Sequence, residues 1–335
     1  MKKHLFGVVV RLLATSPSNN NRLLYEHGYH AGNYADVVKH TALIGLLKHM
    51  SKKKSPFCYV ETHSGAGGYA LASKESQQMA EHEQGISTFL NDQTTDSDLL
   101  HPSMETLLRI MEQASSSNVD LMEGGTFYPG SPMIASALCR EQDSLLLCEK
   151  ETEQFQLLQS RMLMDGEDNH NNDRVILLQE NGYKALKRFE NLQSNKRALI
   201  FIDPPYQMGS DSEQIASLVG FLGKHWRSAR VAIWHPVSRT NRERADRLYE
   251  LVQKAVLGDS SSSSSSSSTE LLATELYTDH DGNDEDETNP SVVGTGMLLV
   301  NPPFGIDEEL KALYSSLGDA LTGGGGHPNI MIKRL

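Results

Sequence analysis

Short apolar runs of strand length recur along this chain, and stretches with the helical spacing of apolar positions separate them. Seven of these runs are predicted to be β-strands, at residues 57–62, 145–149, 175–178, 198–203, 231–234, 271–277 and 297–300. Strands that alternate with helices assemble into a mostly parallel sheet with helices on both faces. The pattern therefore predicts a doubly wound α/β fold with a seven-stranded sheet.

The first helical pattern covers residues 35–49, where Val37, Ile44 and Leu47 recur on one face. Asn33 stands just before this pattern and is predicted to be the N-cap of the helix. A side-chain oxygen at that position can accept a hydrogen bond from a free N–H group of the first turn. We therefore expect an amphipathic helix that leads into the first strand.

Insertions interrupt the main fold at three places. The gap between the first two strands is much longer than one crossover helix needs, so residues 73–127 are predicted to form an inserted helical subdomain. Residues 25–72 and 128–335 then make up the main domain. Residues 259–269, which contain a serine run, and the acidic residues 279–290 are predicted loop insertions, because low-complexity polar sequence cannot bury a core.

The first 24 residues contain no Asp or Glu and four basic residues, Lys2, Lys3, Arg11 and Arg22. This composition is typical of an organellar presequence, and a disordered extension is an equally good interpretation. The protein is accordingly expected in the cytoplasm, or in a mitochondrion or plastid if residues 1–24 form a presequence. The apolar runs are far shorter than a membrane span, so no membrane association is expected.

The formal charge of −12 argues at first against a nucleic-acid partner, but the charges are distributed unevenly. Residues 1–54 hold 9 basic and 2 acidic residues, and residues 184–254 hold 13 basic and 7 acidic residues. Acidic residues concentrate instead in 61–130 and 259–287. The two basic segments would suit a phosphate backbone, although ordinary charged helix faces explain either segment about as well.

The three cysteines, Cys58, Cys139 and Cys148, form no C-x-x-C pair and lie in or beside apolar runs. Neither a zinc site nor a disulfide framework fits this spacing. They are predicted to be buried free thiols in a reducing compartment, and no metal site is predicted.

The clearest chemistry is carried by Asp203-Pro204-Pro205-Tyr206, which follows directly after the apolar run 198–202. The prolines lack N–H groups, and Pro204 favours an extended conformation at Asp203. Such a corner can offer a carboxylate and a peptide carbonyl to the two hydrogens of an exocyclic amine, while the Tyr206 ring stacks on the base. This predicts an amino-group methyltransferase acting on adenine or cytosine. The alternative is a plain strand terminator, the role assigned to Asn301-Pro302-Pro303-Phe304, which has no carboxylate.

Two further features lie at the ends of predicted strands, where open α/β sheets bind ligands. Residues 63–68 are interpreted as a glycine-rich turn entering a helix, where Gly65 lets the backbone approach a ligand and helix N–H groups bind its carboxylate. Glu149 ends the second strand, where a carboxylate can accept hydrogen bonds from both ribose hydroxyls of a nucleoside. Each feature alone also fits a structural role. Because G-x-G-x-x-G spacing is missing, the set fits S-adenosylmethionine better than a dinucleotide.

Five segments carry distinctive motifs: YHAGNYADVVKHT at 29–41, ETHSGAG at 61–67, YPGSP at 128–132, REQD at 140–143 and DPPY at 203–206. Together they resemble the RlmJ family of large-subunit ribosomal RNA adenine-N6 methyltransferases. The similarity runs from about Tyr25 to the C-terminus, with the serine and acidic insertions interrupting it. HAGNxADVxKH and YPGSP are far more specific than the glycine-rich loop.

The resemblance implies a class I S-adenosylmethionine-dependent methyltransferase with a Rossmann-like sheet and a small inserted helical subdomain. It implies that Asp203 is catalytic, with Pro204 and Tyr206 beside it, and that Tyr25 contacts RNA. With Gly65 from the glycine-rich loop added, the candidate cofactor-binding residues are Lys39, His40, His63, Gly65, Ser131, Glu149, Asn181, Gly182 and Asp203. One position departs from the family, since Asn181 stands where the family pattern has Asp, although Asn keeps an acceptor oxygen.

The expected reaction is N6-methylation of one adenine in large-subunit (23S-type) rRNA by a monomeric enzyme. The target base must leave the RNA stack to reach Asp203. Alternatives are a DNA adenine-N6 or cytosine-N4 methyltransferase, and a protein glutamine methyltransferase, which usually has Asn in place of Asp203. A further alternative is a non-catalytic RNA-binding protein of methyltransferase-like fold, but such a scaffold has no need to keep Asp203, Glu149 and the glycine-rich loop together.

Overall fold

The computed structural model of the chain describes residues 30–90, 100–117, 125–163, 174–188, 197–206, 209–237, 242–257, 269–277, 294–321 and 328–335. The predictions that residues 1–24 form an extension and that Tyr25 contacts RNA lie outside the described residues. So do the predictions for the serine run 260–268 and the acidic residues 279–290.

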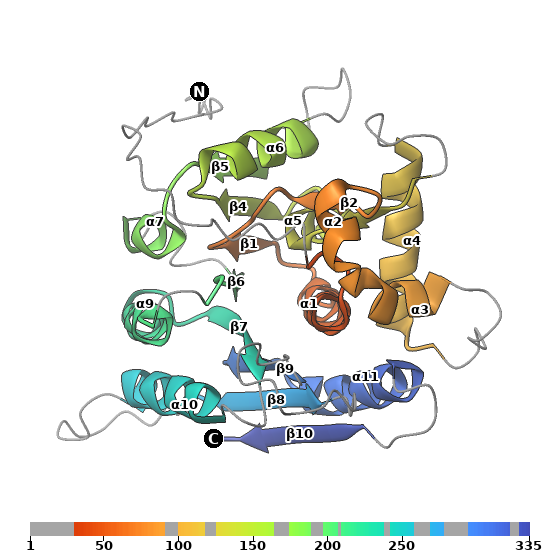
Figure 1. Ribbon diagram of the computed structural model, residues 1–335. Helices are drawn as coiled ribbons and strands as arrows, with labels where there is room; N and C mark the ends of the chain where they lie inside the picture. The colour runs from red at the N-terminus through yellow and green to blue at the C-terminus, as the bar shows by residue number, and fades with distance from the viewer. Residues whose placement is uncertain are drawn as a thin grey trace, which may run out of the picture.

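The centre of the molecule is an eight-stranded sheet with the strand order β10-β8-β9-β7-β6-β1-β4-β5 (Figure 1). The strands from β5 to β7 in this order pair in parallel, and β9, β8 and β10 continue the sheet through antiparallel pairs. The strands are β1 Phe57–Glu61, β4 Ser144–Cys148, β5 Val175–Leu178, β6 Arg197–Ile202, β7 Ala229–Val237, β8 Leu271–Tyr277, β9 Gly294–Val300 and β10 Asn329–Arg334.

All seven predicted strands are confirmed, and the α/β class with them. The prediction that the sheet has seven strands is wrong by one edge strand, β10. Only Ile330, Met331 and Ile332 of this edge strand are apolar, and the strand ends in two charged residues, so its sequence pattern is weak. The direction of the strand order changes between β1 and β6, and ligands of open α/β sheets bind beyond the carboxyl ends of the strands at such a point.

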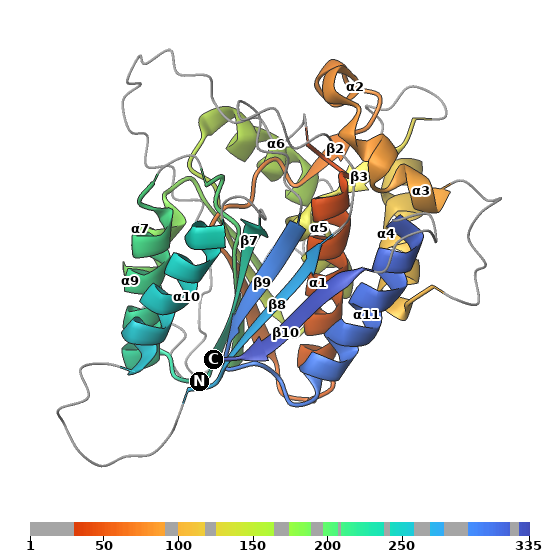
Figure 2. The ribbon, with the colours of Figure 1, turned by 60° about the horizontal axis from the view of Figure 1, so that its bottom comes forward.

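Helices cover both faces of the sheet (Figure 2). One face carries α7 Gly182–Arg188, α9 Asp211–His225 and α10 Arg242–Leu257. The other carries α1 Tyr34–Ser51, with α4 Pro102–Ser117, α5 Ser131–Leu138 and α11 Ile306–Leu321 packed against it. α6 Thr152–Leu163 lies beside β5 (Figure 1). Two hydrophobic cores result, one on each face of the sheet.

The period-two alternation of β6 decides on which face the DPPY corner opens. Leu199 and Phe201 belong to the core on the α1 face, whereas Ile200 and Ile202 belong to the core under α9 and α10. Because successive side chains of a strand point to opposite faces, Asp203 falls on the α1 face. β1 alternates in the same register, which brings Glu61 to that face as well.

α1 is the predicted first helix, and Asn33 is its N-cap as predicted, with its side chain accepting a hydrogen bond from the Asp36 N–H at 2.9 Å. The expectation of an amphipathic helix is wrong, because every residue from Ala35 to Leu47 is buried. The helix lies between the sheet and the other helices of its face, so its polar side chains have no solvent to point into. Their partners must be other protein groups or a ligand.

The long gap between β1 and β4 contains a small antiparallel sheet of β2 Gly68–Ala70 and β3 Phe127–Pro129, and α5 follows β3. The described residues between these strands form helices: α2 Lys74–Met79, η2 Glu81–Gln84, α3 Ser87–Leu90 and α4. The interpretation of 73–127 as an inserted subdomain stays a prediction. The glycine-rich turn leads into β2 and not into a helix, so that part of the prediction is wrong. The reason is that residues 68–70 pair with β3, which keeps their backbone extended.

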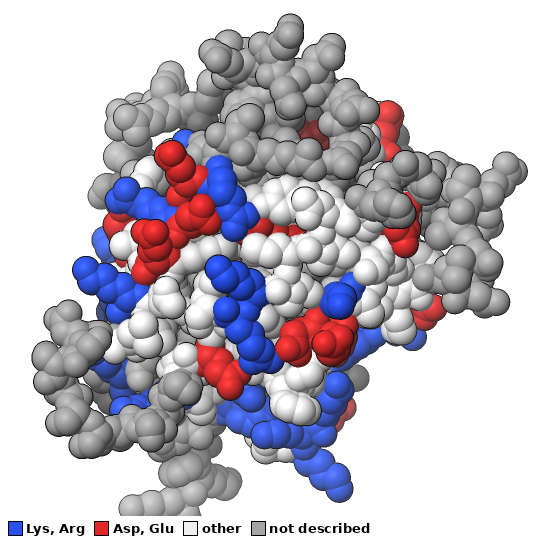
Figure 3. Space-filling model, turned by 90° about the horizontal axis from the view of Figure 1, so that it is seen from below, with Lys and Arg blue, Asp and Glu red and all other residues white. Residues whose placement is uncertain are grey.

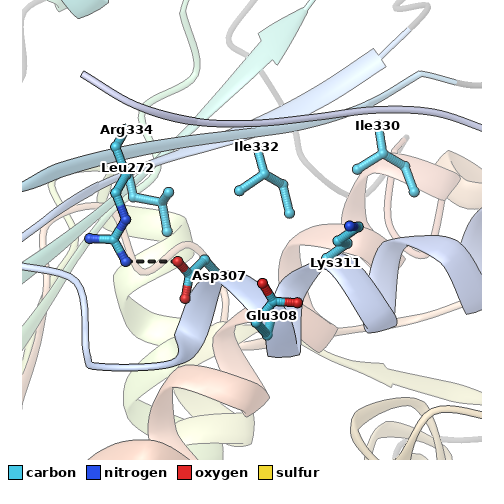
Figure 4. A pocket seen from close by; sticks show the side chains of 7 residues that line it. All are labelled: Leu272, Asp307, Glu308, Lys311, Ile330, Ile332 and Arg334. Carbon is cyan, nitrogen blue, oxygen red and sulfur yellow. Dashed lines mark hydrogen bonds and ion pairs between the residues drawn. The ribbon is translucent and has the colours of Figure 1, made fainter.

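The edge strand β10 is exposed, and its charged residues protect it from pairing with another chain. Ile330 and Ile332 face α11, and Arg334 binds Asp307 at 2.7 Å across a shallow hollow (Figure 4). Figure 3 views the molecule from this side and shows positive and negative side chains next to each other. The hollow contains none of the predicted site residues.

All three cysteines are buried and unbridged, in agreement with their prediction as buried free thiols. In the described residues, no three His, Cys, Asp or Glu side chains gather as a metal site would require. None of the described helices combines the length and the apolar character needed to cross a membrane.

Candidate active site

Asp203 follows β6 at the carboxyl edge of the sheet and meets a lysine from α1. Its Oδ2 atom accepts a hydrogen bond from the Lys39 Nζ atom at 2.8 Å. The Lys39 side chain is 3% exposed and that of Asp203 is 16% exposed, so the lysine is buried while the carboxylate is partly accessible to a ligand. A fixed cation thus occupies one oxygen of Asp203, and the second oxygen can accept a hydrogen bond from a ligand.

The same lysine also pairs with Asp36, which precedes it by one turn of α1, at 2.7 Å. The Asp36 Oδ2 atom accepts a hydrogen bond from the Gly32 N–H at 3.1 Å, which ties the ion pair to the loop before the helix. Burial alone would lower the pKa of Lys39, but the carboxylates of Asp203 and Asp36 raise it above its ordinary value. Lys39 is therefore charged at neutral pH, and HAGNxADVxK acts as one unit that holds it.

The chain turns sharply at Tyr206, whose φ of 51° lies in the left-handed region. The Tyr206 hydroxyl donates a hydrogen bond to the Trp234 carbonyl oxygen at 2.5 Å, and the two rings meet edge to face with centroids 5.9 Å apart. Pro204 is buried, Pro205 is exposed, and the Tyr206 ring is half-buried. A half-buried ring held at both ends offers a rigid face for stacking, and the stacking role of Tyr206 stays a prediction.

Gly65 and Glu149 are joined directly. The Gly65 N–H donates to the Glu149 Oε2 atom at 2.8 Å, and the Glu151 N–H donates to Oε1 at 2.7 Å. Gly65 and Gly67 have φ values of 57° and 84°, which side chains disfavour, so glycine is needed at both positions. The carboxylate of Glu149 is thus held by backbone groups, and each oxygen keeps a lone pair for a ligand hydroxyl.

Ser131 and Glu61 form a second buried pair beside Asp203. The Ser131 hydroxyl donates to Glu61 Oε1, and the Tyr59 hydroxyl donates to Oε2 at 3.1 Å. Burial raises the pKa of Glu61 to about 8, and the charge of Asp203 adds to this, although the hydrogen bond from Ser131 lowers it. Ser131 begins α5, and the Gly130 N–H before it donates to the Gly67 carbonyl at 2.8 Å. The helix N-terminus beside the glycine-rich turn is therefore that of α5.

Asn181 and Gly182 begin α7 and lie against the end of β1. The Asn181 side chain accepts a hydrogen bond from the Lys184 N–H at 3.1 Å, so it caps the helix, a role that Asp or Asn fills equally well. A Cβ atom on Gly182 would lie 2.3 Å from the Thr62 carbonyl oxygen. Only glycine lets the two backbones approach this closely, and the departure from the family at Asn181 leaves the cap intact.

His63 and His40 are both held by neighbouring aromatic residues. The His63 ring meets Tyr183 edge to face at 5.0 Å, and burial lowers the pKa of His63 to about 4, so it is neutral at pH 7. The His40 Nδ1 atom shares a hydrogen bond with the Tyr128 hydroxyl at 2.8 Å, which links α1 to the YPGSP segment. The roles of both histidines as cofactor contacts stay predictions.

The REQD motif lies away from this site and holds the start of the sheet. Asp143 accepts a hydrogen bond from the Phe57 N–H at 2.9 Å, where β1 begins, and pairs with Arg140 at 2.8 Å. Arg140 also donates to the Lys53 carbonyl at 2.9 Å. This motif is structural, so it identifies the family without belonging to the chemistry.

The carboxyl ends of β1, β4, β5 and β6 thus collect most of the candidate residues that the structure describes, whereas His40 lies against Tyr128 of β3. The structure joins Lys39 to Asp203, Gly65 to Glu149, and Ser131 to Glu61, and it sets Gly182 against Thr62. Sequence reasoning missed three residues of this cluster: Asp36, Glu61 and Trp234. Asp36 and Glu61 stand inside quoted motifs, and an acidic residue two positions before a glycine-rich turn was a usable signal, whereas nothing in the sequence marks Trp234.

Two buried hydroxyl groups test whether this edge fits a polar ligand. Neither the Ser64 Oγ atom nor the Tyr183 hydroxyl has a hydrogen-bond partner among the described residues. These residues are only 4% and 6% exposed. A buried polar group without a partner costs roughly 1–3 kcal/mol, so the pair indicates a ligand that supplies the missing hydrogen bonds. With the Glu149 carboxylate and the open backbone of the glycine-rich turn, the edge suits a nucleoside with an amino-acid tail.

Comparisons with known proteins agree with this chemistry. A relative from Escherichia coli K12, named ribosomal RNA large subunit methyltransferase J, is 29% identical over 309 residues, which cover 92% of this chain and 98% of the relative. A relative of the same name from Haemophilus influenzae is 28% identical over 300 residues, which cover 89% and 94%. Among solved structures, a Legionella pneumophila protein superposes with a TM-score of 0.70 at 26% identity, with 91% of this chain and 98% of that chain covered.

A family model also matches most of the sequence. The model described as "Ribosomal RNA large subunit methyltransferase D, RlmJ" matches residues 54–331, which include the glycine-rich turn, YPGSP and DPPY. The sequence resemblance to the RlmJ family, drawn from these motifs, is confirmed. The chain belongs to the RlmJ family of ribosomal RNA large-subunit methyltransferases.

Proposed function

We propose that this chain methylates the exocyclic N6 atom of an adenine in large-subunit rRNA, with Asp203 as the catalytic residue. Its family membership makes it a methyltransferase, and S-adenosylmethionine is its cofactor, as the sequence predicted. The observation that carries the proposal is the Asp203 carboxylate, held on one oxygen by Lys39 and open on the other at the carboxyl edge of β6.

The adenine amine is a poor nucleophile because its nitrogen lone pair is delocalised into the ring. A hydrogen bond from the amine to the open oxygen of Asp203, and a second one to the Pro204 carbonyl, hold the amine with its lone pair directed out of the ring plane. Lys39 keeps Asp203 in one orientation, since its ammonium group is itself fixed by Asp36. Such placement of the reacting nitrogen supplies most of the rate advantage.

S-adenosylmethionine, when bound, supplies a methyl group on a sulfonium that leaves as a neutral thioether. N6 carries a surplus proton once it is methylated, and the open oxygen of Asp203 would accept that proton. Glu149 would bind the ribose, and the glycine-rich turn would bind the amino-acid tail. Ser64 and Tyr183, with their unpaired hydroxyls, are further candidates for cofactor contacts.

Tyr206 and Tyr25 are assigned to the RNA. Tyr206 stacks on the extruded adenine, because its half-buried ring lies at the corner that grips the amine. Tyr25 contacts the RNA by analogy with the family, and the large-subunit rRNA is the partner that the names of the relatives imply. The chain acts as a monomer, and residues 73–127 form the inserted subdomain; both stay proposals.

The test is a methylation assay with labelled S-adenosylmethionine. Large-subunit rRNA transcribed in vitro is the substrate, small-subunit rRNA and duplex DNA are the comparisons, and digested nucleosides are identified by mass spectrometry. We expect N6-methyladenosine in the large-subunit rRNA alone. Asp203→Ala should lower the rate by about a thousandfold or more, because it removes both the hydrogen-bond acceptor and the proton acceptor.

Calorimetry of S-adenosylmethionine binding to Asp203→Ala is the control for the fold, and an affinity within about threefold of wild type is expected. N4-methylcytidine, or label in DNA, would instead identify one of the alternative methyltransferases. Normal turnover by Asp203→Ala would contradict the catalytic assignment.

A further inference from the structure

Trp234 contacts two members of the DPPY site at once. It lies in β7, next to β6, and its half-buried side chain packs against the core of the α1 face. The Lys39 Nζ atom lies 5.0 Å from the centre of the indole ring, within the range of a cation–π interaction. On another side, the Tyr206 ring meets the indole edge to face, and the Tyr206 hydroxyl binds the Trp234 carbonyl. One residue therefore borders both the cation that holds Asp203 and the ring beside it.

The indole is itself fixed by a hydrogen bond on the next strand. Its Nε1–H donates to the Thr295 Oγ1 atom of β9 at 2.7 Å, and Thr295 is 1% exposed. This bond sets the rotation of the ring, which packing alone would leave less defined. A phenyl ring at position 234 could fill much of the space but could not make this bond.

The backbone at the end of β7 is anchored from the opposite face. His235 follows Trp234 and points toward α10, where its Nε2 atom shares a hydrogen bond with the Tyr249 hydroxyl at 2.9 Å. The Tyr249 hydroxyl lies 2.5 Å from the Oε1 atom of Glu275, which is completely buried and also pairs with Arg242. Strand alternation thus directs Trp234 to the active site and His235 into a polar network that holds the strand end.

We propose that Trp234 is a positioning residue for methyl transfer, which sets the Lys39 ammonium and the Tyr206 ring relative to Asp203. The inference rests on the proposed function of Asp203 and names a residue outside the DPPY motif. Thr295 acts through Trp234 by fixing the indole. Neither residue needs to touch the substrate. Their loss therefore displaces Lys39 and Tyr206 without removing any of the side chains that act on the substrate.

The kinetic test compares substitutions at the two tryptophans of the chain. Trp234→Leu removes the aromatic face and should lower kcat about 10- to 100-fold, because small displacements of reacting groups have effects of this size. Thr295→Val removes only the acceptor of the Nε1–H bond, and Trp234→Phe removes this bond with part of the ring; both should lower kcat by roughly three- to tenfold. The KM for S-adenosylmethionine should stay within about twofold in all three.

Trp226→Phe is the matched control, since Trp226 is buried at the end of α9 in the core of the opposite face. It should leave kcat within about twofold of wild type while lowering the melting temperature. A kcat of Trp234→Leu or Trp234→Phe that equals that of wild type in folded protein would overturn the proposal. So would a parallel loss of kcat in Trp226→Phe, because kcat would then follow stability and not position.

A spectroscopic readout tests the contacts without relying on activity. In the Trp226→Phe background all tryptophan fluorescence comes from Trp234. Adding Lys39→Met removes the ammonium group from the ring, and adding Thr295→Val removes the acceptor of the Nε1–H; each should change the intensity or the emission maximum. Unchanged spectra in both would overturn the positioning role. If wild-type protein methylates none of the nucleic acids tested, the proposed function fails, and the spectra still decide whether Trp234 holds Lys39.

Discussion

Two corners of this molecule share one sequence form, Asp203-Pro204-Pro205-Tyr206 and Asn301-Pro302-Pro303-Phe304. They lie at opposite ends of the strands of the sheet. β6 runs parallel to β1, so the first corner opens at the carboxyl edge with the glycine-rich turn. β9 runs antiparallel to β7, so the second corner lies where β7 begins, and the Asn301 side chain donates to the Ala229 carbonyl at 3.0 Å. Strand direction therefore places the two corners at opposite ends of the sheet.

The surroundings of the two corners differ as much as their positions. At the first, the acidic side chain is held by a buried lysine and the aromatic ring by Trp234. At the second, the Asn301 side chain is used within the turn itself, and Phe304 is 96% exposed. Each corner contains one residue with a left-handed backbone, Tyr206 or Asn301. The proline pair builds a stiff corner in both cases, and chemistry arises only where neighbouring strands and helices add polar partners.

The sharpest test of this contrast exchanges the first residues of the two corners. Asp203→Asn keeps the shape of the side chain but removes the charge that pairs with Lys39 and the proton acceptor, so methyl transfer should fall by about a thousandfold. Asn301→Asp cannot donate to the Ala229 carbonyl and should cost roughly 1–2 kcal/mol of stability while turnover stays within about twofold. Turnover assays and thermal melts of both variants measure this. An equal loss of turnover in the two variants would remove the distinction.

Much of the first corner could be predicted from sequence because its signals are local. Apolar runs gave the strands, DPPY stood directly after one of them, and Asn33 stood directly before the first helix. Open α/β sheets gather the carboxyl ends of their parallel strands, so Asp203, Glu149 and the glycine-rich turn were expected along one edge. The alternation in β6 would even have given the face of Asp203, once α1 was known to cover that face.

The parts that could not be predicted depend on contacts between distant segments. The pairing of Lys39 with Asp203 joins residues 164 positions apart. It requires α1 to be buried on all its faces, whereas an amphipathic pattern predicts one solvent-exposed face. Trp234 gains its position from the register of β7 with β9, which no local pattern encodes. β2 and β10 form because partner strands are present, since β2 is only three residues long and β10 ends in two charged residues.

A smaller effect is expected from the aromatic residues that end the two corners. Tyr206→Phe loses the hydrogen bond to Trp234 but keeps the ring, and kcat should fall by roughly three- to tenfold because the stacking face is less fixed. Tyr206→Ala should also raise the KM for RNA by about tenfold or more, since stacking on a base is worth roughly 1–3 kcal/mol. Phe304→Ala is the matched control, and its exposure predicts kinetics within about twofold of wild type. A Phe304→Ala variant as impaired as Tyr206→Ala would give the second corner a role in RNA binding.

The smallest effect concerns pH, because the first corner has a buried acid beside it. Burial raises the pKa of Glu61 from 4.5 to about 8, so between these values the folded protein holds a proton that the unfolded chain has lost. This contribution to stability is complete below pH 4.5 and is lost as the pH rises through 8. Glu61→Gln mimics the protonated form, so its melting temperature should gain on that of wild type between pH 5 and 8. Glu308→Gln, exposed beside the second corner, is the control, and its difference from wild type should stay constant. If the melting temperatures of Glu61→Gln and wild type instead change equally with pH, Glu61 is ionised in the folded protein. The carboxyl ends of the strands then carry one more negative charge than proposed.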